Sequence, residues 1–246
     1  MKYVLFAALA AAGIFLLYIL LLVVSALAVN GRREYGTNSR YYRFLLNSST
    51  AIGMKILRVK VHLTGEEKIP KGKRFLLVEN HRSNYDPIVT WRALPGYDVA
   101  FISKSDNFKV PVWGRLIRRC GFLAIDRSSP RSSMETLNRA AKMIKDGTVS
   151  FGIYPEGTRN KTDRLLLPFH NGVFMAAHKA ACPVVVVAVR GTDKIYKQYI
   201  RRRTDVYLDV IDVISPEEHS SLRTGDVGAR VKADFENFLG SGDIND

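Results

Sequence analysis

Cysteine is scarce in this chain, which has two among its 246 residues. A fold built on disulfides is therefore excluded, and Cys120 and Cys182 both lie inside apolar runs, which suits a reducing compartment. Acidic residues are also few, since 23 Asp and Glu oppose 37 Lys and Arg, a formal net charge of +14. No pattern of a nucleic-acid-binding module accompanies this charge. We therefore expect anionic membrane lipids and an anionic substrate as partners, and no nucleic acid.

Compact groups of metal ligands are missing as well. The chain has five histidines, but no His-Glu-x-x-His or similarly close grouping. His170 and His178 fall on one face of an expected helix, and with His81 and Asp86 as further ligands they form the basis of a metal-hydrolase alternative. Without a close grouping, we expect no metal and no cofactor.

One long uncharged apolar run stands near the N-terminus, from Tyr3 to Val29. As a helix it would be about 40 Å long, enough to cross the roughly 30 Å hydrocarbon core of a bilayer with some tilt. A cleaved signal peptide is the alternative, because residues 25–28 are mostly small, but its apolar region would be shorter, about 7–15 residues. We therefore expect a retained membrane anchor.

Basic residues flank this run unequally. Lys2 precedes it, whereas four arginines follow it closely: Arg32, Arg33, Arg40 and Arg43. Basic residues collect on the cytoplasmic side of membrane helices. The asymmetry predicts a single N-terminal anchor with the catalytic part of the chain on the cytoplasmic side, whether the helix spans the bilayer or is partly embedded.

Residues 38–57 have an amphipathic pattern at helical spacing. Apolar residues such as Tyr41, Phe44, Ile52 and Ile56 alternate there with basic and polar ones. Such a helix either lies in the membrane interface or packs on the globular body, and the sequence leaves both open. We assign residues 1–57 to a membrane anchor and interfacial helix, and residues 58–246 to a globular domain.

Strand-like and helix-like runs alternate after residue 58. We expect strands at 59–63, 74–79, 98–103, 121–125, 148–154, 183–189 and 205–212, and helices near 87–94, 107–118, 132–146, 171–180 and 225–239. This rhythm predicts an α/β fold with a single, mostly parallel sheet flanked by helices. The N-terminal membrane helix and the amphipathic interfacial helix precede it.

A histidine and an aspartate stand together where an expected strand turns into a helix, in the segment from Asn80 to Asp86. A neutral imidazole accepts a proton near neutral pH, and a carboxylate on its other nitrogen fixes the tautomer. The alternative is structural. Asp86 before Pro87 has the features of a helix N-cap, or Ser83 caps the helix and Asp86 closes a capping box.

A second polar turn follows another expected strand, in the segment from Tyr154 to Arg159. Gly157 allows close approach of the backbone, Thr158 supplies a hydroxyl group, and Arg159 can bind an oxyanion with two hydrogen bonds. Ligands of open α/β sheets bind at the carboxyl ends of the strands. Alone, this turn is also compatible with a surface salt bridge.

In this order and at this spacing, the two turns resemble those of the 1-acylglycerol-3-phosphate acyltransferase family, within the glycerolipid acyltransferases. Four blocks between about residues 58 and 190 carry the resemblance: the His-x4-Asp block 80–86, then 121–127, 154–159 and 182–187. Tyr154 stands where phenylalanine is usual, and Cys182 precedes the proline of the fourth block.

The resemblance implies transfer of a fatty acyl group from acyl-CoA or acyl-carrier protein to the sn-2 hydroxyl of lysophosphatidate, giving phosphatidate without a further cofactor. It makes residues 58–246 an acyltransferase domain. Its second and third blocks imply a set of residues that bind the substrate phosphate: Arg127, Glu156, Gly157, Thr158 and Arg159. Lys104 resembles a lysine that the family places near the reacting carbonyl or phosphate, and a solvated loop lysine is its alternative.

We assign His81 as the general base that acts on the acceptor hydroxyl, and Asp86 as the group that orients its ring. No serine or cysteine occupies a nucleophile elbow, so we expect no covalent acyl-enzyme, and for Ser83 we favour a capping role over a nucleophilic one. We expect Glu156 to fix Arg159 or the turn. The segment from Leu165 to Phe169 is either a loop that faces the acyl chain or part of the core.

Two other hypotheses remain open. One is the same chemistry on another acceptor, such as a different lysolipid or an acylated amino acid. The other is a non-enzymatic module that binds anionic lipid through its basic surface.

Overall fold

The computed structural model describes residues 1–126, 128–199 and 201–241, and within them seven strands form one sheet in the order β1-β7-β6-β2-β5-β3-β4. The strands are β1 (Val59–Thr64), β2 (Leu76–Glu79), β3 (Val99–Lys104), β4 (Leu123–Ile125), β5 (Ser150–Ile153), β6 (Val184–Arg190) and β7 (Thr204–Ile214). Neighbouring strands are parallel except β6 and β7. The predicted α/β fold with a mostly parallel sheet is confirmed.

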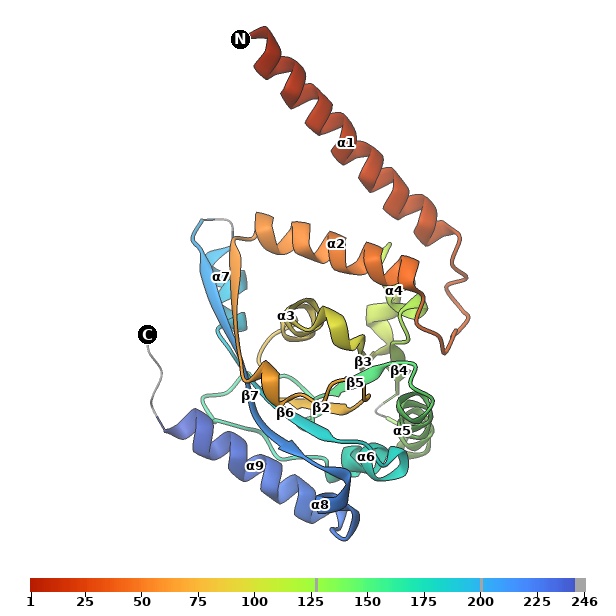
Figure 1. Ribbon diagram of the computed structural model, residues 1–246, viewed down its shortest axis with the longest axis vertical. Coiled ribbons are helices and arrows are strands. Elements are labelled where there is room, and N and C mark those ends of the chain that lie inside the picture. The colour runs from red at the N-terminus through yellow and green to blue at the C-terminus, as the bar shows by residue number, and fades with distance from the viewer. Residues whose placement is uncertain (127, 200, 242–246) are drawn as a thin grey trace.

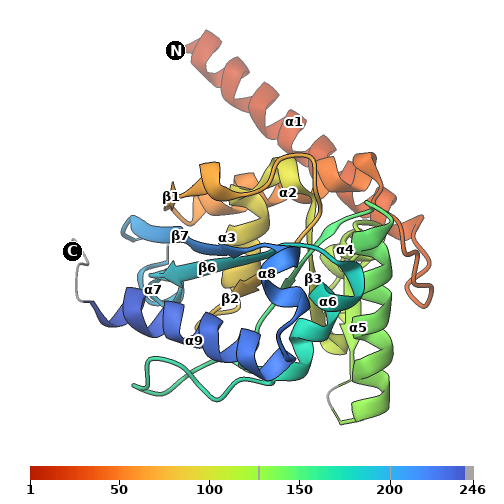
Figure 2. The ribbon, with the colours of Figure 1, turned by 60° about the horizontal axis from the view of Figure 1, so that its bottom comes forward.

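Helices cover both faces of the sheet. The helices are α1 (Lys2–Leu27), α2 (Arg40–Ile56), α3 (Asp86–Ala93), α4 (Trp113–Arg119), α5 (Pro130–Lys145), α6 (Met175–Ala180), α7 (Thr192–Gln198), α8 (Pro216–Ser220) and α9 (Thr224–Gly240). Figures 1 and 2 show α2 and α3 on one face of the sheet, and α6 and α9 on the other. Because both faces are covered, the central strands are apolar throughout, as in the Val-rich β6, which is buried from Val184 to Val189.

The helix α5 illustrates how local sequence sets an element. Ser129 precedes it and its side chain accepts a hydrogen bond from the backbone N–H of Ser132, and Pro130 occupies the first helical position. Leu137 and Ile144, two turns apart, are buried against the core, and the opposite face is polar.

One sequence expectation about helices was wrong, and two helices were missed. The helix expected over 107–118 is divided into a 3₁₀ turn (Ser105–Lys109) and α4, because Val110 precedes Pro111 and is extended. The helices α7 and α8 were not predicted. For α8 a signal was present, since Ser215 and Glu218 form a capping box around Pro216.

The helix α1 is long and apolar enough to cross a membrane by length and composition, and most of it is exposed. Figure 1 shows it projecting from the body. Its C-terminal end is attached to the body: the hydroxyl groups of Ser25 and Tyr41 lie 2.6 Å apart, and the Arg115 guanidinium donates to the carbonyl of Ala26. That guanidinium also lies at the C-terminal end of α1, where the helix dipole is negative and favours a cation.

The helix α2 packs on the globular body, which was one of the two alternatives for residues 38–57. Leu45 and Leu46 are fully buried, and the buried Arg43 guanidinium donates to the carbonyls of Val99 and Cys120 at 2.8 and 2.7 Å. The outer face of α2 is partly apolar, so contact with a membrane interface stays a prediction. The predicted boundary at residues 57 and 58 falls between α2 and β1, and the division into two domains also stays a prediction.

Candidate active site

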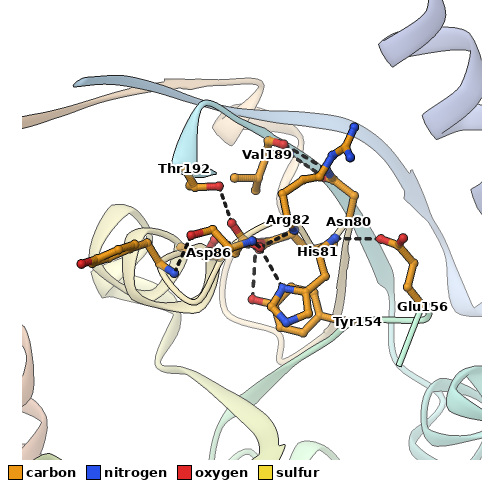
Figure 3. Close-up of polar contacts among 12 residues, drawn as sticks. Asn80, His81, Arg82, Asp86, Tyr154, Glu156, Val189 and Thr192 are labelled. Atoms are coloured by element: carbon orange, nitrogen blue, oxygen red, sulfur yellow. Dashed lines mark hydrogen bonds and ion pairs between the residues drawn. The ribbon is translucent and has the colours of Figure 1, made fainter. Parts of the chain in front are cut away.

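The candidate active site lies at the carboxyl ends of the central strands. The strand β2 lies between β5 and β6, and all three are parallel, so the residues that follow them meet at one edge of the sheet. His81 follows β2, Tyr154 follows β5, and Thr192 follows β6 (Figure 3). This is the edge at which open α/β sheets bind their ligands.

The structure brings His81 and Asp86 together. The Nδ1–H group of His81 donates a hydrogen bond of 2.8 Å to Oδ2 of Asp86, since a carboxylate can only accept. The His81 ring is 13% exposed and stacks on Tyr154, with 3.9 Å between ring centroids. A proton on Nδ1 leaves the lone pair of the neutral imidazole on Nε2, the nitrogen on the other side of the ring.

The Asp86 carboxylate is fully buried and highly hydrogen-bonded. In addition to His81, Oδ2 accepts from the backbone N–H groups of Arg82 and Ser83, each at 2.8 Å, and Oδ1 accepts from the Thr192 hydroxyl. Asp86 is the first residue of α3, and the N-cap is Tyr85, without a side-chain cap. The two capping alternatives for Asp86 and Ser83 were therefore wrong, and the Asp86 carboxylate instead binds the turn that precedes the helix. The Ser83 hydroxyl accepts from the N–H of Tyr85 within that turn.

Glu156 connects the two turns through the backbone. Its buried carboxylate accepts from the N–H of His81 and from the N–H of Leu167, both at 2.8 Å. Burial raises the pKa of Glu156, and these two N–H groups oppose the shift because they stabilise the charged form. The Asn160 N–H in turn donates to the His81 carbonyl at 2.7 Å. Glu156 thus fixes the turn, as expected, and both of its oxygens are used in doing so.

Position 157 requires glycine for a structural reason that the sequence did not reveal. Its φ is +67°, a region that favours glycine, and a Cβ atom here would lie 2.7 Å from the His170 ring. The expectation was that Gly157 lets the backbone approach a ligand. The group that approaches it in the structure is His170.

Thr158 and Arg159 line a cavity of about 970 Å³ that also contains His81 in its wall. Lys104 lines the same cavity, but its side chain is 67% exposed and paired with Asp106. Together with Lys109 it lowers the pKa of Asp106 to about 2, through hydrogen bonds to the carboxylate. Lys104 thus has features of both its alternatives, a lysine near the site and a solvated loop lysine. Arg127 lies outside the described residues.

Comparison with known proteins identifies the family. A family model described as acyltransferase matches residues 60–190, which is more than half of the chain. The chain belongs to the acyltransferase family. The resemblance predicted from the four sequence blocks is confirmed.

Two relatives of this chain are named 1-acyl-sn-glycerol-3-phosphate acyltransferases. The chain is 28% identical over 180 residues to the 1-acyl-sn-glycerol-3-phosphate acyltransferase of Saccharomyces cerevisiae, covering 72% of this chain and 59% of the relative. It is 38% identical over 137 residues to a chloroplastic enzyme of that name from Brassica napus, covering 55% of this chain and 39% of that relative. The chain therefore spans less than two thirds of the length of these relatives.

A crystal structure has the same fold. The 1-acyl-sn-glycerophosphate (LPA) acyltransferase of Thermotoga maritima superposes with a TM-score of 0.67 at 22% sequence identity, covering 93% of this chain and 90% of that one. At this identity the likeness concerns the fold.

A second buried carboxyl group lies behind the His81–Asp86 pair. Glu79 at the end of β2 is fully buried, accepts from the Thr90 hydroxyl at 2.7 Å and lies 3.5 Å from the Tyr154 hydroxyl. Burial and the nearby negative charge of Asp86 raise the pKa of Glu79 well above its usual range. Burial and the same two carboxyl groups also raise the pKa of Tyr154. Both shifts favour the protonated, uncharged forms of Glu79 and Tyr154.

Sequence reasoning missed two side chains that position the site. The Asn80 amide exchanges hydrogen bonds with the backbone of Val189, at 2.9 and 2.7 Å, and so extends the pairing of β2 with β6. Thr192 binds the far oxygen of Asp86. The sequence places Thr192 just after a predicted strand, but it does not show that this strand lies beside β2.

The structure decides two remaining alternatives. His178 stacks on His219 near Cys182, which precedes β6, whereas His81 follows β2, so these histidines lie at opposite ends of parallel strands. The metal site that combined them is wrong. Leu166 is buried and Phe169 packs edge-on against Phe235 of α9, so these two belong to the core.

Proposed function

We propose that this acyltransferase transfers a fatty acyl group from a thioester to the sn-2 hydroxyl of 1-acylglycerol-3-phosphate, giving phosphatidate. The observation that carries the proposal is the 2.8 Å bond from His81 to a buried Asp86, in the wall of a cavity that Arg159 also lines. The names of the relatives support lysophosphatidate as the acceptor.

The proposed reaction needs no covalent acyl-enzyme. The Nε2 atom of His81 removes the proton of the acceptor hydroxyl while the oxygen attacks the thioester carbonyl carbon. The carbon–sulfur bond then breaks, and the imidazolium returns the proton to the leaving thiolate, so one ester and one free thiol form and His81 is restored. Asp86 stabilises the imidazolium between these steps and keeps Nε2 in position.

Binding of the acceptor phosphate is assigned to the third block. Arg159 offers a planar, permanently charged donor group that fits a phosphate, and Thr158 offers a hydroxyl group beside it. We propose Arg127 as a second phosphate ligand from its sequence block alone. Glu156 and Gly157 act by holding the turn, and for Lys104 we propose a contact with the phosphate or the reacting carbonyl once its pair with Asp106 opens.

The acyl chain occupies the apolar part of the same cavity. The walls of this cavity come from one side of α2 and from the globular body that α2 covers. They include Gly53, Met54, Trp91, Phe101, Trp113 and Phe122. A volume of about 970 Å³ lies at the upper end of the range for ligand sites. We propose acyl-CoA or acyl-carrier protein as the donor, without a further cofactor.

The membrane supplies and receives the lipids. We propose that α1 anchors the chain in a membrane whose anionic lipids attract the basic surface, with the domain from residue 58 on the cytoplasmic side. The long, exposed, apolar α1 and the arginines that follow it support this placement. The partly apolar outer face of α2, with Phe44 65% exposed, supports an interfacial position for that helix.

The test is an assay of thiol release in detergent with lysophosphatidate and a panel of acyl donors. We expect His81→Ala to reduce kcat by about 10²–10⁴, the usual contribution of a general base. His62→Ala is the matched control, because His62 also pairs with an aspartate, Asp205, at 2.8 Å, but does not line the cavity. Equal losses in the two variants would contradict the assignment of His81.

The acceptor is tested with Arg159→Ala. We expect this variant to raise the KM for lysophosphatidate far more than the KM for a lysolipid without a phosphate monoester. An equal effect on both acceptors would point to another lysolipid or acylated acceptor. A wild-type protein that binds anionic vesicles without any thiol release would favour the non-enzymatic lipid-binding hypothesis.

A further inference from the structure

A basic and aromatic surface borders the cavity on the side of α7. It comprises six exposed side chains from α7 and from the segment between α7 and β7, and we call it the α7 edge: Tyr196, Lys197, Tyr199, Arg201, Arg202 and Arg203. Tyr196 is 79% exposed and Tyr199 is 52% exposed. Four cations and the ring of Tyr196 are exposed to solvent, whereas Tyr199, although half exposed, also lines the cavity.

The inward face of α7 belongs to the candidate active site. Thr192 at its first position donates to the Asp86 carboxylate, and Ile195 lines the cavity. The fold therefore needs α7 for its buried face, but this need does not explain the exposed Tyr196 on its outer face. Acidic neighbours neutralise only part of the charge, since Asp193 lies 3.8 Å from Lys197 and Asp205 lies 3.0 Å from Arg203.

The α7 edge is close to the end of α2 that lies away from α1. The Arg58 side chain donates to the Arg201 carbonyl at 3.4 Å, and the Thr204 N–H donates to the Arg58 carbonyl at 3.1 Å. Arg58 and Lys55 add two further exposed cations there. In Figure 1, α1 rises from the side of the body that α2 covers, and α7 lies at the far end of α2.

We infer that the α7 edge binds the surface of an anionic bilayer, as a second contact at a distance from the α1 anchor. Tyrosine is enriched at the depth of lipid headgroups, where its ring and its hydroxyl group are both accommodated. Lysine and arginine near that depth are attracted by anionic headgroups. This inference rests on the proposed membrane placement of α1, and it adds the surface and the lipid charge on which the second contact depends.

Site-specific fluorescence in nanodiscs tests the inference on the full chain. The native thiols are buried, and burial raises the pKa of Cys120 and Cys182 to about 12, so they stay protonated during labelling. An environment-sensitive fluorophore is attached at Lys197→Cys, with Ala10→Cys as the reporter on α1. Ala233→Cys on α9, which lies away from α1 in Figure 1, is the matched control.

We expect nitroxide-labelled headgroups to quench the label at position 197 at least about twofold more in nanodiscs with roughly 30% phosphatidylglycerol than in phosphatidylcholine alone. Salt at about 1 M, where the Debye length is about 3 Å, should remove most of that difference. The double substitution R201Q/R202Q should also remove most of the difference in quenching between the two lipids, at low salt. The label at position 233 should stay unquenched in both lipids.

Three results would overturn the inference. If position 10 is quenched but position 197 behaves like position 233, α1 is embedded and the α7 edge is not in contact, so the proposed function stands without this inference. If position 10 is also unquenched, the membrane placement itself fails. If an acidic acyl-carrier protein changes the emission at position 197 and anionic lipid does not, the α7 edge binds the donor protein instead.

Discussion

At the scale of single residues, the Asp86 carboxylate is the most constrained group of the site. Its two oxygens accept from the His81 ring, from two backbone N–H groups and from the Thr192 hydroxyl. Several donors at hydrogen-bond distance replace the water that a carboxylate loses when it is buried. The ring of His81 is therefore oriented by a group that is itself bound by the turn after β2 and by Thr192 of α7.

Removing the Thr192 hydroxyl tests this arrangement. Thr192→Val keeps the shape of the side chain but leaves one oxygen of a buried carboxylate without its donor, which costs about 1.5–3 kcal/mol. We expect kcat to fall about tenfold or more with little change in the KM of either substrate, and Thr192→Ser to retain most activity. A KM effect without a kcat effect would contradict the assignment of Thr192 as a positioning residue for Asp86.

Glu79 gives a prediction about pH. Its folded-state pKa is raised by burial and by Asp86, so the folded state keeps a proton that the unfolded state loses above about pH 4.3. The stability that this proton contributes is fully present below that pH and is lost as pH rises toward the raised pKa. Glutamine has no such proton to lose. The unfolding temperature of Glu79→Gln relative to wild type should therefore rise between about pH 5 and about pH 8, measured in detergent.

An exposed carboxyl group provides the control for that measurement. Glu67 lies in a surface turn between β1 and β2. A change in unfolding temperature that is the same in Glu79→Gln at both pH values, or equal in Glu67→Gln, would contradict the raised pKa of Glu79.

At the scale of elements, the sequence predicted all seven strands and most helices, because period and strand composition carry that information. It also predicted the His81–Asp86 pair, since both residues stand on one turn. It did not predict Thr192, because its contact with Asp86 spans 106 positions and depends on β6 lying next to β2. The helix α7 is short and polar on its outer side, so its pattern is weak.

The helix α2 shows the same limit. Its amphipathic pattern is clear, but the buried Arg43 that donates to carbonyls at the ends of other elements could not be deduced from a pattern. From the pattern alone, an arginine on this helix is expected to be solvated or to contact lipid headgroups. Only the fold reveals the acceptors that make its burial possible.

A prediction at this scale concerns Gly53, an interior residue of α2 in the cavity wall. A Cβ atom at this position meets nothing within 4 Å, so a larger side chain extends into empty space. We expect Gly53→Leu to lower kcat/KM for donors of about 16–18 carbons some 10–100-fold relative to donors of about 8 carbons, the effect of about 1.4–2.8 kcal/mol. Gly53→Ala is the control and should leave the ratio nearly unchanged.

At the scale of the whole molecule, α1 stands apart from the compact body in the described residues. Most of its apolar side chains are exposed, and its contacts with the body are limited to its C-terminal part. An aqueous environment does not stabilise such a helix, since its apolar surface stays uncovered. The apolar surface of α1 is covered once lipid surrounds the helix.

Two arginines in α1 test the anchor. Leu16 and Leu20 are exposed on one side of the helix, and each arginine near the middle of a membrane helix costs about 2.5–3.5 kcal/mol. We expect Leu16→Arg/Leu20→Arg to shift the chain from the membrane to the soluble fraction with unchanged far-UV circular dichroism of the body. Leu16→Ile/Leu20→Ile should remain in the membrane. Retention of the arginine variant after carbonate washing would contradict the role of α1.

The bonds between the two turns have a consequence for regiochemistry. The Glu156 carboxylate accepts from the N–H of His81, and the Asn160 N–H donates to the His81 carbonyl. These bonds join the residue that carries the imidazole and the turn that carries Arg159 into one rigid unit. In the proposed reaction, a rigid unit fixes the span between the ring atom that removes the alcohol proton and the turn that binds the phosphate. Positional isomers of the same lipid differ in that span, so they are separated by geometry even when their chemical groups are identical.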